Sequence, residues 1–417
     1  MPLVSRRIDR ANVFLWTLYD FANSIVTIVF FLHFSQWLVL DKGVSDFWYN
    51  MIFTAGSVLL VFTAPILGSI ADKTGRHQRY LNTTTVLMFF FFLSTTFAIL
   101  FFSDDFVLAI FFYLLANYLY QLSFVFYNSL LHDISPPEKW GRISGLGQTG
   151  NLLGQIGGLL IALPFAAGSM YLLGESGRAQ TFLPAVLVFF ALALPFLTLF
   201  KLPRRRTVDN KISLRAEYKN QWQQFKELIK VPSMGPFLLS YFFFMDAIIT
   251  VSNNFPIYLG SVFGVSDNVK TVLLVGIILT AAIGAFSSGW AADKIGLRKA
   301  LGIVLVSWVV ILPLLGLTSD FTIFVLLSIL MGFSFGSIWT ITRAVMTALC
   351  PKEKLNFGFS FYTLAERVST FLGPLSWGLI TWLFESFGST RYRFAMMAMA
   401  IFVAVGVYFF RTVKIEH

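Results

Sequence analysis

The sequence contains little charge and almost no cysteine. Only 12% of its 417 residues are charged and one, Cys350, is cysteine, whereas 57% are hydrophobic and 48 are phenylalanine. A single cysteine excludes an internal disulfide and a cysteine-rich metal site. No soluble domain of this size keeps so much apolar surface away from water. The composition therefore indicates a polytopic membrane protein.

Enzyme signatures are missing as well. The chain has no P-loop, no H-E-x-x-H and no G-x-S-x-G. Its four histidines are too scattered along the predicted topology to suggest a metal site: His33, His77, His132 and His417. We therefore expect no enzyme activity, no cofactor, no metal and no nucleic-acid partner.

Apolar stretches about 20 residues long, enough to cross a bilayer, recur along the whole chain. They predict twelve spans at 13–40, 48–71, 81–102, 106–131, 144–167, 180–200, 235–260, 269–292, 300–317, 321–347, 357–384 and 392–411. Helices are required because lipid offers no partner to open backbone groups, and the alternation of barrel strands is absent. The predicted fold is an all-α polytopic membrane protein of two pseudo-symmetric six-helix bundles, 1–200 and 234–417, joined by a cytoplasmic linker, 201–233.

Positive residues gather in alternate loops. The net charge is +10, and most of the 31 Lys and Arg residues fall on one side of the predicted topology. This asymmetry places both termini in the cytoplasm. We expect a monomer in the lipid bilayer, in the plasma (inner) membrane of a prokaryote or in a vacuolar or other internal membrane of a eukaryote.

The linker contains one amphipathic segment. Its apolar residues recur at spacings of four, four, three and four: Leu214, Tyr218, Trp222, Phe225 and Ile229. This spacing predicts a helix with one apolar face. It lies either on the cytoplasmic membrane surface, with Arg204, Arg205 and Arg206 near anionic headgroups, or packed on the bundle as a solvated linker.

One charged loop occurs twice, half the chain apart. GSIADKTGRHQR begins at Gly68 and GWAADKIGLRK at Gly289, each between two apolar runs. Such a repeat indicates two similar halves. Together with the long central loop, the pattern G-x-x-x-D-[RK]-x-G-R-[RK] resembles the major facilitator superfamily. The matching positions are Gly68, Asp72, Lys73, Gly75 and Arg76, and then Gly289, Asp293, Lys294, Gly296 and Arg298.

These loops are expected to act as gates rather than to touch substrate. Asp72 and Asp293 follow helix ends, where each accepts hydrogen bonds from the start of a helix in the opposite half. The basic residues of both loops complete an ionic latch. Such a latch stabilises the state that is closed to the cytoplasm.

A narrower resemblance rests on three segments. WTLYDFANS (16–24), GRISGLGQTGNLLGQIGG (141–158) and ERVSTFLGP (366–374) resemble the vacuolar effluxer family associated with autophagy and its bacterial relatives. The resemblance implies transport of small solutes, which are amino acids in the fungal vacuolar members. It leaves the substrate of this chain open.

Two carboxylates lie inside predicted spans, each with polar residues one or two turns on. The first-helix group is Asp20, Asn23 and Ser24, and its counterpart in the second half is Asp246, Thr250 and Asn253. A buried carboxylate is costly unless it pairs, protonates or faces water, so both groups are candidates for coupling to protons or another cation. Alternatively, each carboxylate braces a neighbouring helix.

Two further groups and the single residue Glu366 are candidates for the substrate cavity, since the superfamily resemblance implies that helices 1, 4, 7 and 10 line the central path. Helix 4 carries Asn117 and Gln121, and helix 10 carries Trp339 and Arg343 one turn apart. Amides suit a neutral or zwitterionic solute, and a guanidinium suits a carboxylate. The amides also serve as contacts between helices, and Arg343 as a partner of Asp246 or Glu366.

Helix 11 carries Glu366 next to Arg367, and small residues follow. We interpret Glu366 as specific to this chain and Arg367 as structural. The glycine-rich stretches allow close helix contacts, either for sliding during transport or for static packing. The contact residues are Gly154, Gly157 and Gly158 on helix 5 and Gly373 and Pro374 on helix 11.

Together these features predict a secondary active transporter of a small solute, an amino acid or related metabolite, that works by alternating access and is proton-coupled. One alternative is a lipid or amphiphile flippase on the same fold, favoured by the abundant phenylalanine. An alternative of another class is a non-transporting membrane receptor or assembly protein.

Overall fold

A computed structural model describes residues 9–102, 104–135, 140–202, 214–350, 362, 365–366 and 369–415. Its described part is helical throughout, without strands, which confirms the predicted all-α class. The longer helices are α1 (Arg10–Val29), α2 (Asp46–Thr74), α3 (His77–Phe101), α4 (Phe106–Ile134), α5 (Trp140–Ala166), α6 (Phe182–Leu199), α7 (Leu214–Ile229), α8 (Met234–Phe263), α9 (Asp267–Ile295), α10 (Leu297–Leu317), α11 (Phe321–Leu349), α13 (Leu372–Leu383) and α14 (Thr390–Phe410). Two short π-helical segments, η1 (Phe30–Phe34) and η2 (Trp37–Asp41), extend α1. Two short 3-10 helices, η4 (Gly177–Thr181) and η6 (Glu385–Phe387), precede α6 and α14.

Within the described residues, 11 helical segments are long and apolar enough to cross a bilayer. They correspond to the predicted spans except for 357–384, much of which lies outside the described residues. The described helix of that span, α13, has 12 residues and begins only at Leu372. Residues 204–206 and 367, which the sequence assigned to headgroup contact and to a structural role, also lie outside the described part.

Acidic residues begin two helices, α4 and α11, at ends predicted to face away from the cytoplasm. The Asp105 carboxylate accepts the backbone N–H of Leu108 at 3.3 Å, and that of Asp320 accepts the N–H of Ile323 at 2.9 Å. Each carboxylate satisfies a donor that a helix start leaves open. Asp105 and Asp320 therefore set where α4 and α11 begin.

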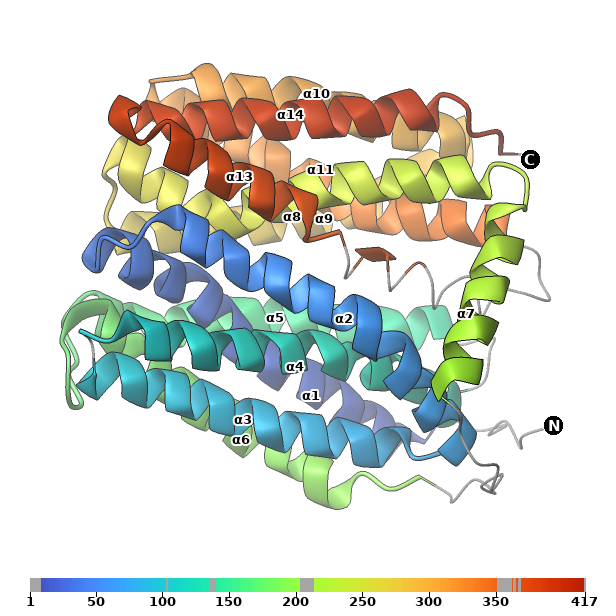
Figure 1. The fold of residues 1–417 in the computed structure, drawn as a ribbon, viewed down its shortest axis with the longest axis horizontal. Helices are drawn as coiled ribbons and strands as arrows, with labels where there is room; N and C mark the ends of the chain where they lie inside the picture. Colours follow the sequence, from blue (N-terminus) through green and yellow to red (C-terminus); the bar gives the residue numbers. More distant parts are fainter. Residues whose placement is uncertain are drawn as a thin grey trace. The chain divides into compact units, whose positions relative to one another are not determined.

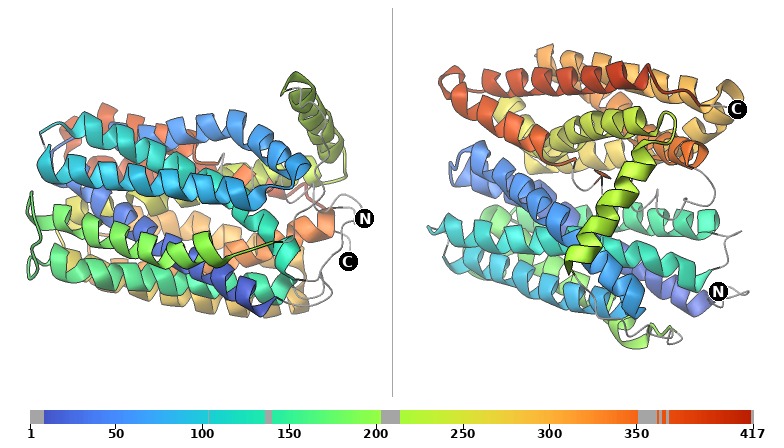
Figure 2. Two further views of the ribbon diagram at one scale, coloured as in Figure 1. Left: turned by 90° about the horizontal axis from the view of Figure 1, so that it is seen from below. Right: turned by 45° about the vertical axis from the view of Figure 1, so that its right-hand side comes forward.

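The chain divides into two compact units. The first contains Met1–Lys42 and Phe62–Glu217, and the second contains Gly43–Val61 and Tyr218–His417. Helices of each unit run alongside one another (Figures 1 and 2). One helix, α2, is shared: its first half belongs to the second unit and its second half to the first.

The shared helix α2 contains a proline just beyond this division. Pro65 lies inside α2, and proline has no backbone N–H. The helical hydrogen bond to the carbonyl of Val61, four residues earlier, is therefore absent. The division between the units thus falls where α2 lacks one of its internal bonds.

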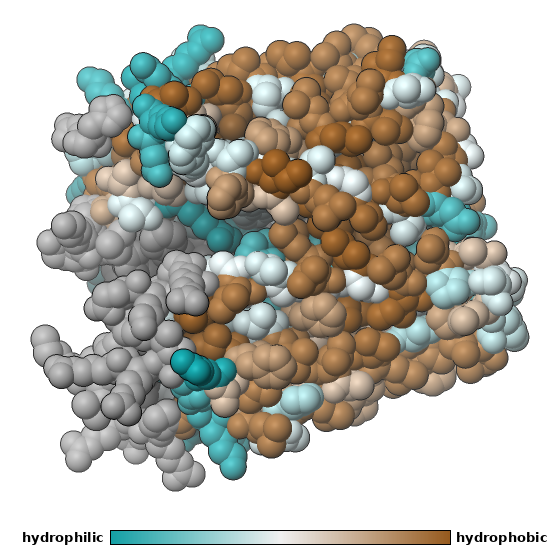
Figure 3. Space-filling model, turned by 180° about the vertical axis from the view of Figure 1, so that it is seen from behind, coloured by the Kyte–Doolittle hydropathy of each residue, from teal (hydrophilic) through white to brown (hydrophobic). Residues whose placement is uncertain are grey.

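Apolar side chains cover much of the surface. Figure 3 shows one face on which hydrophobic residues predominate and polar residues gather toward the margins. Phe286 on α9 is 85% exposed and Leu326 on α11 is 64% exposed. Large apolar side chains at that exposure suit contact with lipid. The protein is accordingly an integral membrane protein.

Helices α9 and α11 approach so closely that only glycine fits between them. A Cβ added to Gly336 would lie 1.7 Å from the carbonyl oxygen of Ala281, whereas one added to Gly276 would meet nothing within 4 Å. Such small residues let two backbones meet in a membrane.

We predict that Gly336→Ala lowers the midpoint of thermal unfolding in detergent, because α9 must move to admit the methyl group. Overpacking of this kind costs about 1–3 kcal/mol. Gly276→Ala, on the same pair of helices, is the matched control and should leave the midpoint unchanged. Equal midpoints for both variants would contradict the close contact.

Candidate functional site

Asp20 holds three helices of the first unit together. It is 7% exposed, and its carboxylate accepts the Tyr127 hydroxyl of α4 at 3.3 Å and the Asn151 amide of α5 at 3.2 Å. Trp16, one turn earlier, stacks on the Tyr127 ring with centroids 4.5 Å apart. Both carboxylate oxygens thus accept hydrogen bonds from neighbouring helices, as a bracing residue requires.

The polar residues that follow Asp20 are buried. Asn23 is 1% and Ser24 is 3% exposed, and the Ser24 hydroxyl donates to the Asp20 carbonyl at 2.8 Å. On α4, Asn117 is 8% exposed and Gln121 is half-buried. The candidate residues of the first unit are therefore mostly buried between packed helices.

Glycines of α5 bring that helix against α1. A Cβ on Gly154 would lie 2.3 Å from the Phe21 carbonyl oxygen, and one on Gly158 would lie 2.6 Å from that of Ile25. At Gly157, by contrast, a Cβ would make only an ordinary contact of 3.7 Å with the Phe21 ring. Two of the three predicted contact glycines on this helix thus meet the α1 backbone.

Asp246 belongs to α8, is fully buried in the second unit and lies against the start of α13. Its Oδ2 accepts the backbone N–H of Gly373 at 2.7 Å, and the N–H groups of Phe371 and Leu372 also point to this carboxylate. A helix start offers open N–H donors and positive potential to an anion. The carboxylate therefore caps α13.

The other side of this carboxylate is less well satisfied. Among the described residues, Asp246 Oδ1 and the hydroxyl of Thr250 have no hydrogen-bond partner, although Thr250 is also fully buried. A Cβ on Gly373 would lie 2.3 Å from the Thr250 hydroxyl oxygen and 2.8 Å from Asp246 Oδ1. Glycine at this position therefore lets α13 begin directly against both groups.

The local sequence is also compatible with a helix start at Leu372. Pro374 occupies the first turn, where its missing N–H leaves no helical bond unmade. Just before it, the Thr370 carbonyl accepts the Ser57 hydroxyl at 3.0 Å and the Phe371 carbonyl accepts that of Thr54 at 3.4 Å. Both donors come from the first half of α2.

A polar stripe on the first half of α2, formed by Asn50, Thr54 and Ser57, binds the other helices of the second unit. The sequence analysis missed this stripe. Asn50 and Asn254 are fully buried and exchange two amide hydrogen bonds, of 3.0 and 2.8 Å. Asn253, the predicted candidate, has a half-buried side chain, and its carbonyl accepts the Tyr49 hydroxyl at 3.1 Å. The four-residue spacing from Thr250 to Asn254 was the available signal.

Charged and aromatic groups meet between α8, α11 and residue 366. Arg343 is exposed, Glu366 is half-exposed, and both act electrostatically on the hydroxyls of Tyr241 and Tyr362. The two tyrosine rings are 4.5 Å apart, and the Tyr362 hydroxyl is 2.9 Å from that of Thr342. One positive and one negative group thus lie within electrostatic range of the same pair of phenols. The sequence reasoning had not singled out these tyrosines.

Trp339, one turn before Arg343, is half-buried. Its ring meets Phe335 edge-on, with centroids 6.1 Å apart. Part of the side chain is therefore exposed.

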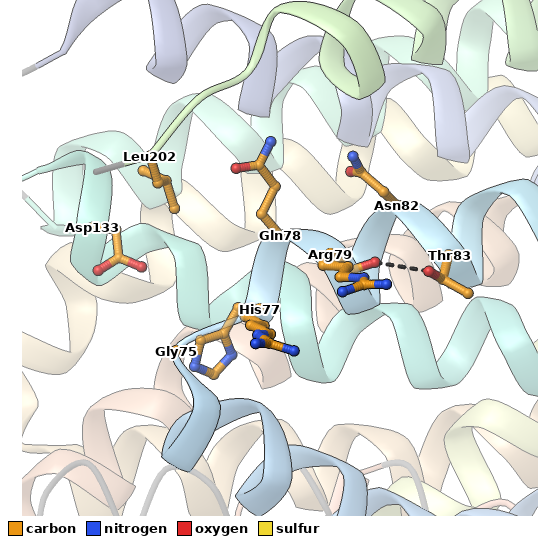
Figure 4. A pocket seen from close by; sticks show the side chains of 9 residues that line it. Gly75, His77, Gln78, Arg79, Asn82, Thr83, Asp133 and Leu202 are labelled. Carbon is orange, nitrogen blue, oxygen red and sulfur yellow. Dashed lines mark hydrogen bonds between the residues drawn. The ribbon is translucent and has the colours of Figure 1, made fainter. Parts of the chain in front are cut away.

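The first repeated loop borders a cavity of about 340 Å³ in the first unit (Figure 4). Gly75 has a left-handed backbone (φ 61°), and it ends the turn between α2 and α3. Arg76 precedes the first residue of α3. The cavity is lined by Gly75, Arg76, His77, Gln78, Arg79, Asn82, Thr83, Asp133 and Leu202. The side chain of Asp72 lies outside the described part, and Lys73 is exposed.

The second repeated loop also contains a glycine with positive φ. Gly296 has φ 87° between α9 and α10, and Arg298 donates to the carbonyl of Arg411 at 2.9 Å. Lys294 lies 3.6 Å above the Trp290 ring, while Asp293 is exposed. At Gly289 a Cβ would make only an ordinary contact, as the nearest atom is 3.6 Å away. Within the described residues, no three His, Cys, Asp or Glu side chains form a metal-binding group.

We predict that Asn50→Ala lowers thermal stability, because it leaves the buried Asn254 amide without its partner. Such a group costs about 1–3 kcal/mol. Asn254→Ala should act alike, and the double variant should be less destabilised than the sum of the two. Additive losses in a double-mutant cycle would contradict direct pairing.

Comparison with known proteins gives concordant results. The sequence model of the family described as "Vacuole effluxer Atg22 like" matches residues 48–417. An uncharacterized MFS-type transporter of Bacillus subtilis, YxiO, is 25% identical over 86% of this chain and 86% of its own length.

Solved structures share the fold at low identity. A variant of the nucleoside transporter NupG superposes with a TM-score of 0.76 at 13% identity, covering 97% of this chain and 100% of that one. A bacterial homologue of the human lysosomal transporter Spinster, inward-facing and unoccupied, gives 0.72 at 16% identity, covering 97% and 96%. These likenesses confirm the fold that the repeated loops predicted.

Proposed function

The chain belongs to the Atg22-like vacuole effluxer family and is a transporter of the major facilitator type, and on that premise we propose that it moves an amino-acid-like solute by proton-coupled alternating access. Asp246 is the proton-exchanging group of this proposal. Arg343 and Glu366 are its solute-binding groups. The observation that carries the proposal is the unequal surroundings of the two predicted carboxylates.

The unpartnered oxygen of Asp246 supports its role in coupling. Asp20 accepts a side-chain hydrogen bond on each oxygen, but Asp246 Oδ1 has no donor among the described residues. A carboxylate oxygen withdrawn from water without a donor is costly, and a proton on it removes that cost. Oδ2 meanwhile stays bound to the Gly373 N–H in either state.

Protonation of Asp246 would alter its hold on α13. The ionised carboxylate attracts the positive end of that helix, and the neutral acid attracts it less. The first half of α2 also binds the residues just before α13, through Thr54 and Ser57. A proton at Asp246 therefore acts on the point where α8, α13 and α2 meet, as a coupling site requires.

The charged pair near the tyrosines supports a zwitterionic solute. Arg343 offers a planar donor for a carboxylate and Glu366 accepts from an ammonium, and both act electrostatically on the hydroxyls of Tyr241 and Tyr362. Trp339 adds an apolar wall. An amino acid presents the complementary charges on neighbouring atoms.

We predict that Asp246→Asn abolishes accumulation driven by a pH gradient in proteoliposomes while solute exchange without a gradient continues. The asparagine oxygen still accepts from Gly373 but carries no exchangeable proton. The solute is the amino acid that most raises the midpoint of thermal unfolding in a screen of amino acids, dipeptides, sugars and lysolipids.

Asp20→Asn is the matched control, and it should retain the response to the gradient at lower thermal stability. Unchanged gradient dependence in Asp246→Asn would remove this residue from coupling. A screen in which lysolipids stabilise the protein and amino acids do not would refute the amino-acid proposal and favour a flippase.

We predict that Glu366→Gln raises the KM for the amino acid at least about tenfold, because a charge-assisted hydrogen bond contributes about 1.5–3 kcal/mol. The KM for its N-acetyl derivative, which lacks the ammonium, should not respond. Arg343→Gln should affect both solutes. Glu385→Gln, at an exposed carboxylate of η6, should affect neither; equal responses to Glu366→Gln and Glu385→Gln would contradict the assignment.

A further inference from the structure

Helix α7 has an apolar strip that remains partly open. Trp222 is 58% exposed and Ile229 is 40% exposed, while Leu228 is fully buried and Phe225 is half-buried. At about 100° per residue, Trp222 and Ile229 point within about 20° of each other, and Phe225 and Leu228 follow on one side. The edge of the strip formed by Phe225 and Leu228 is packed, and the edge formed by Trp222 and Ile229 is exposed.

Lysines follow the open edge of the strip. Lys219, Lys226 and Lys230 are exposed, and on the same wheel they point within about 40° of one another, beside Trp222. The Lys226 ammonium lies 5.4 Å from the centre of the Trp222 ring. Apolar residues flanked by lysines form the surface that an interfacial helix presents to a membrane.

The position of α7 brings this surface to the bilayer boundary. Four residues, 230–233, connect it to the spanning helix α8, and a chain of that length reaches at most about 14 Å. The connection is a tight turn: Val231 N–H donates to the Leu228 carbonyl at 3.1 Å, and Ser233 has a left-handed backbone (φ 65°). Lys414 N–H fixes this turn by donating to the Ser233 hydroxyl at 2.9 Å.

The direction of α7 fits the same location. Figures 1 and 2 show it running across α8 rather than along it. Because α8 crosses the bilayer, a helix that runs across its end lies along the membrane surface.

We propose that α7 is a membrane-surface helix that inserts Trp222 and Ile229 below the headgroups and binds anionic lipid headgroups with Lys219, Lys226 and Lys230. Tryptophan at headgroup depth and lysines that extend toward phosphate are the usual anchors of such a helix. The three lysines give this flank of α7 a positive charge. The short turn to α8 keeps α7 close to the membrane, whose anionic lipids carry the opposite charge. This proposal does not depend on the transported solute.

A labelling experiment tests the insertion. In a Cys350→Ala background, which removes the single cysteine, Trp222→Cys and Gln223→Cys are each labelled with the fluorophore NBD in full-length protein. The protein is placed in nanodiscs of phosphatidylcholine with 30% phosphatidylglycerol. Position 223 points about 100° away from 222 on the helix and is the control.

NBD at position 222 should be quenched at least twofold more than at 223 by lipids that carry a nitroxide on the acyl chain. Equal quenching would overturn the proposal. Protection of position 222 from both the nitroxide lipid and aqueous iodide would also overturn it, since the strip would then be covered by protein. Ile229→Cys and Glu227→Cys, about 160° apart, form a second pair if the first does not fold.

The lysines are tested in the same assay. Changing Lys219, Lys226 and Lys230 to Gln together should remove the extra quenching at position 222 that phosphatidylglycerol gives over pure phosphatidylcholine. Lys414→Gln, an exposed lysine outside α7, should keep it. Quenching that is the same with and without phosphatidylglycerol in the unmodified helix would refute the headgroup contact.

Discussion

The hydrogen bond between the Gly373 N–H and Asp246 connects three helices of the second unit, α8, α13 and the first half of α2. It fixes the start of α13 against the middle of α8, and the residues just before α13 accept hydroxyls from α2. In a bilayer the open N–H groups of a helix start need a protein partner, since water is absent. One carboxylate supplies that partner here, so its charge and the position of α13 are linked.

The two carboxylates that look alike in the sequence have different surroundings. Asp20 and Asp246 each lie on the first helix of a half, with a hydroxyl residue four positions on. Ser24 bonds back to the Asp20 carbonyl, whereas the Thr250 hydroxyl has no partner among the described residues. Sequence spacing locates both groups on a helix face. It does not reveal that one faces two side-chain donors and the other faces a helix start.

The sequence predicted most of the fold and part of the site for physical reasons. The length of the apolar stretches predicts the spans, and the periodicity of residues 214–229 predicts the helix α7. Both patterns can be read from the sequence because each is a property of a single helix. The polar stripe of Asn50, Thr54 and Ser57 was missed because a few hydroxyl and amide side chains in an apolar stretch form too weak a pattern. Such a pattern does not reveal which residues they bond. Gly373 and Pro374 suit a helix start, but the partner of that start is Asp246, 126 residues before Leu372, and a local pattern does not reveal so distant a contact.

The division of α2 has a mechanical consequence. Its first half is bonded into the second unit through Asn50 and Ser57, and its second half belongs to the first unit. The carbonyl of Val61, left without its helical bond by Pro65, is where this continuous helix resists bending least. The stiffness of α2 is therefore uneven along its length: buried amides hold its first half in place, and the helix is weakest just beyond them.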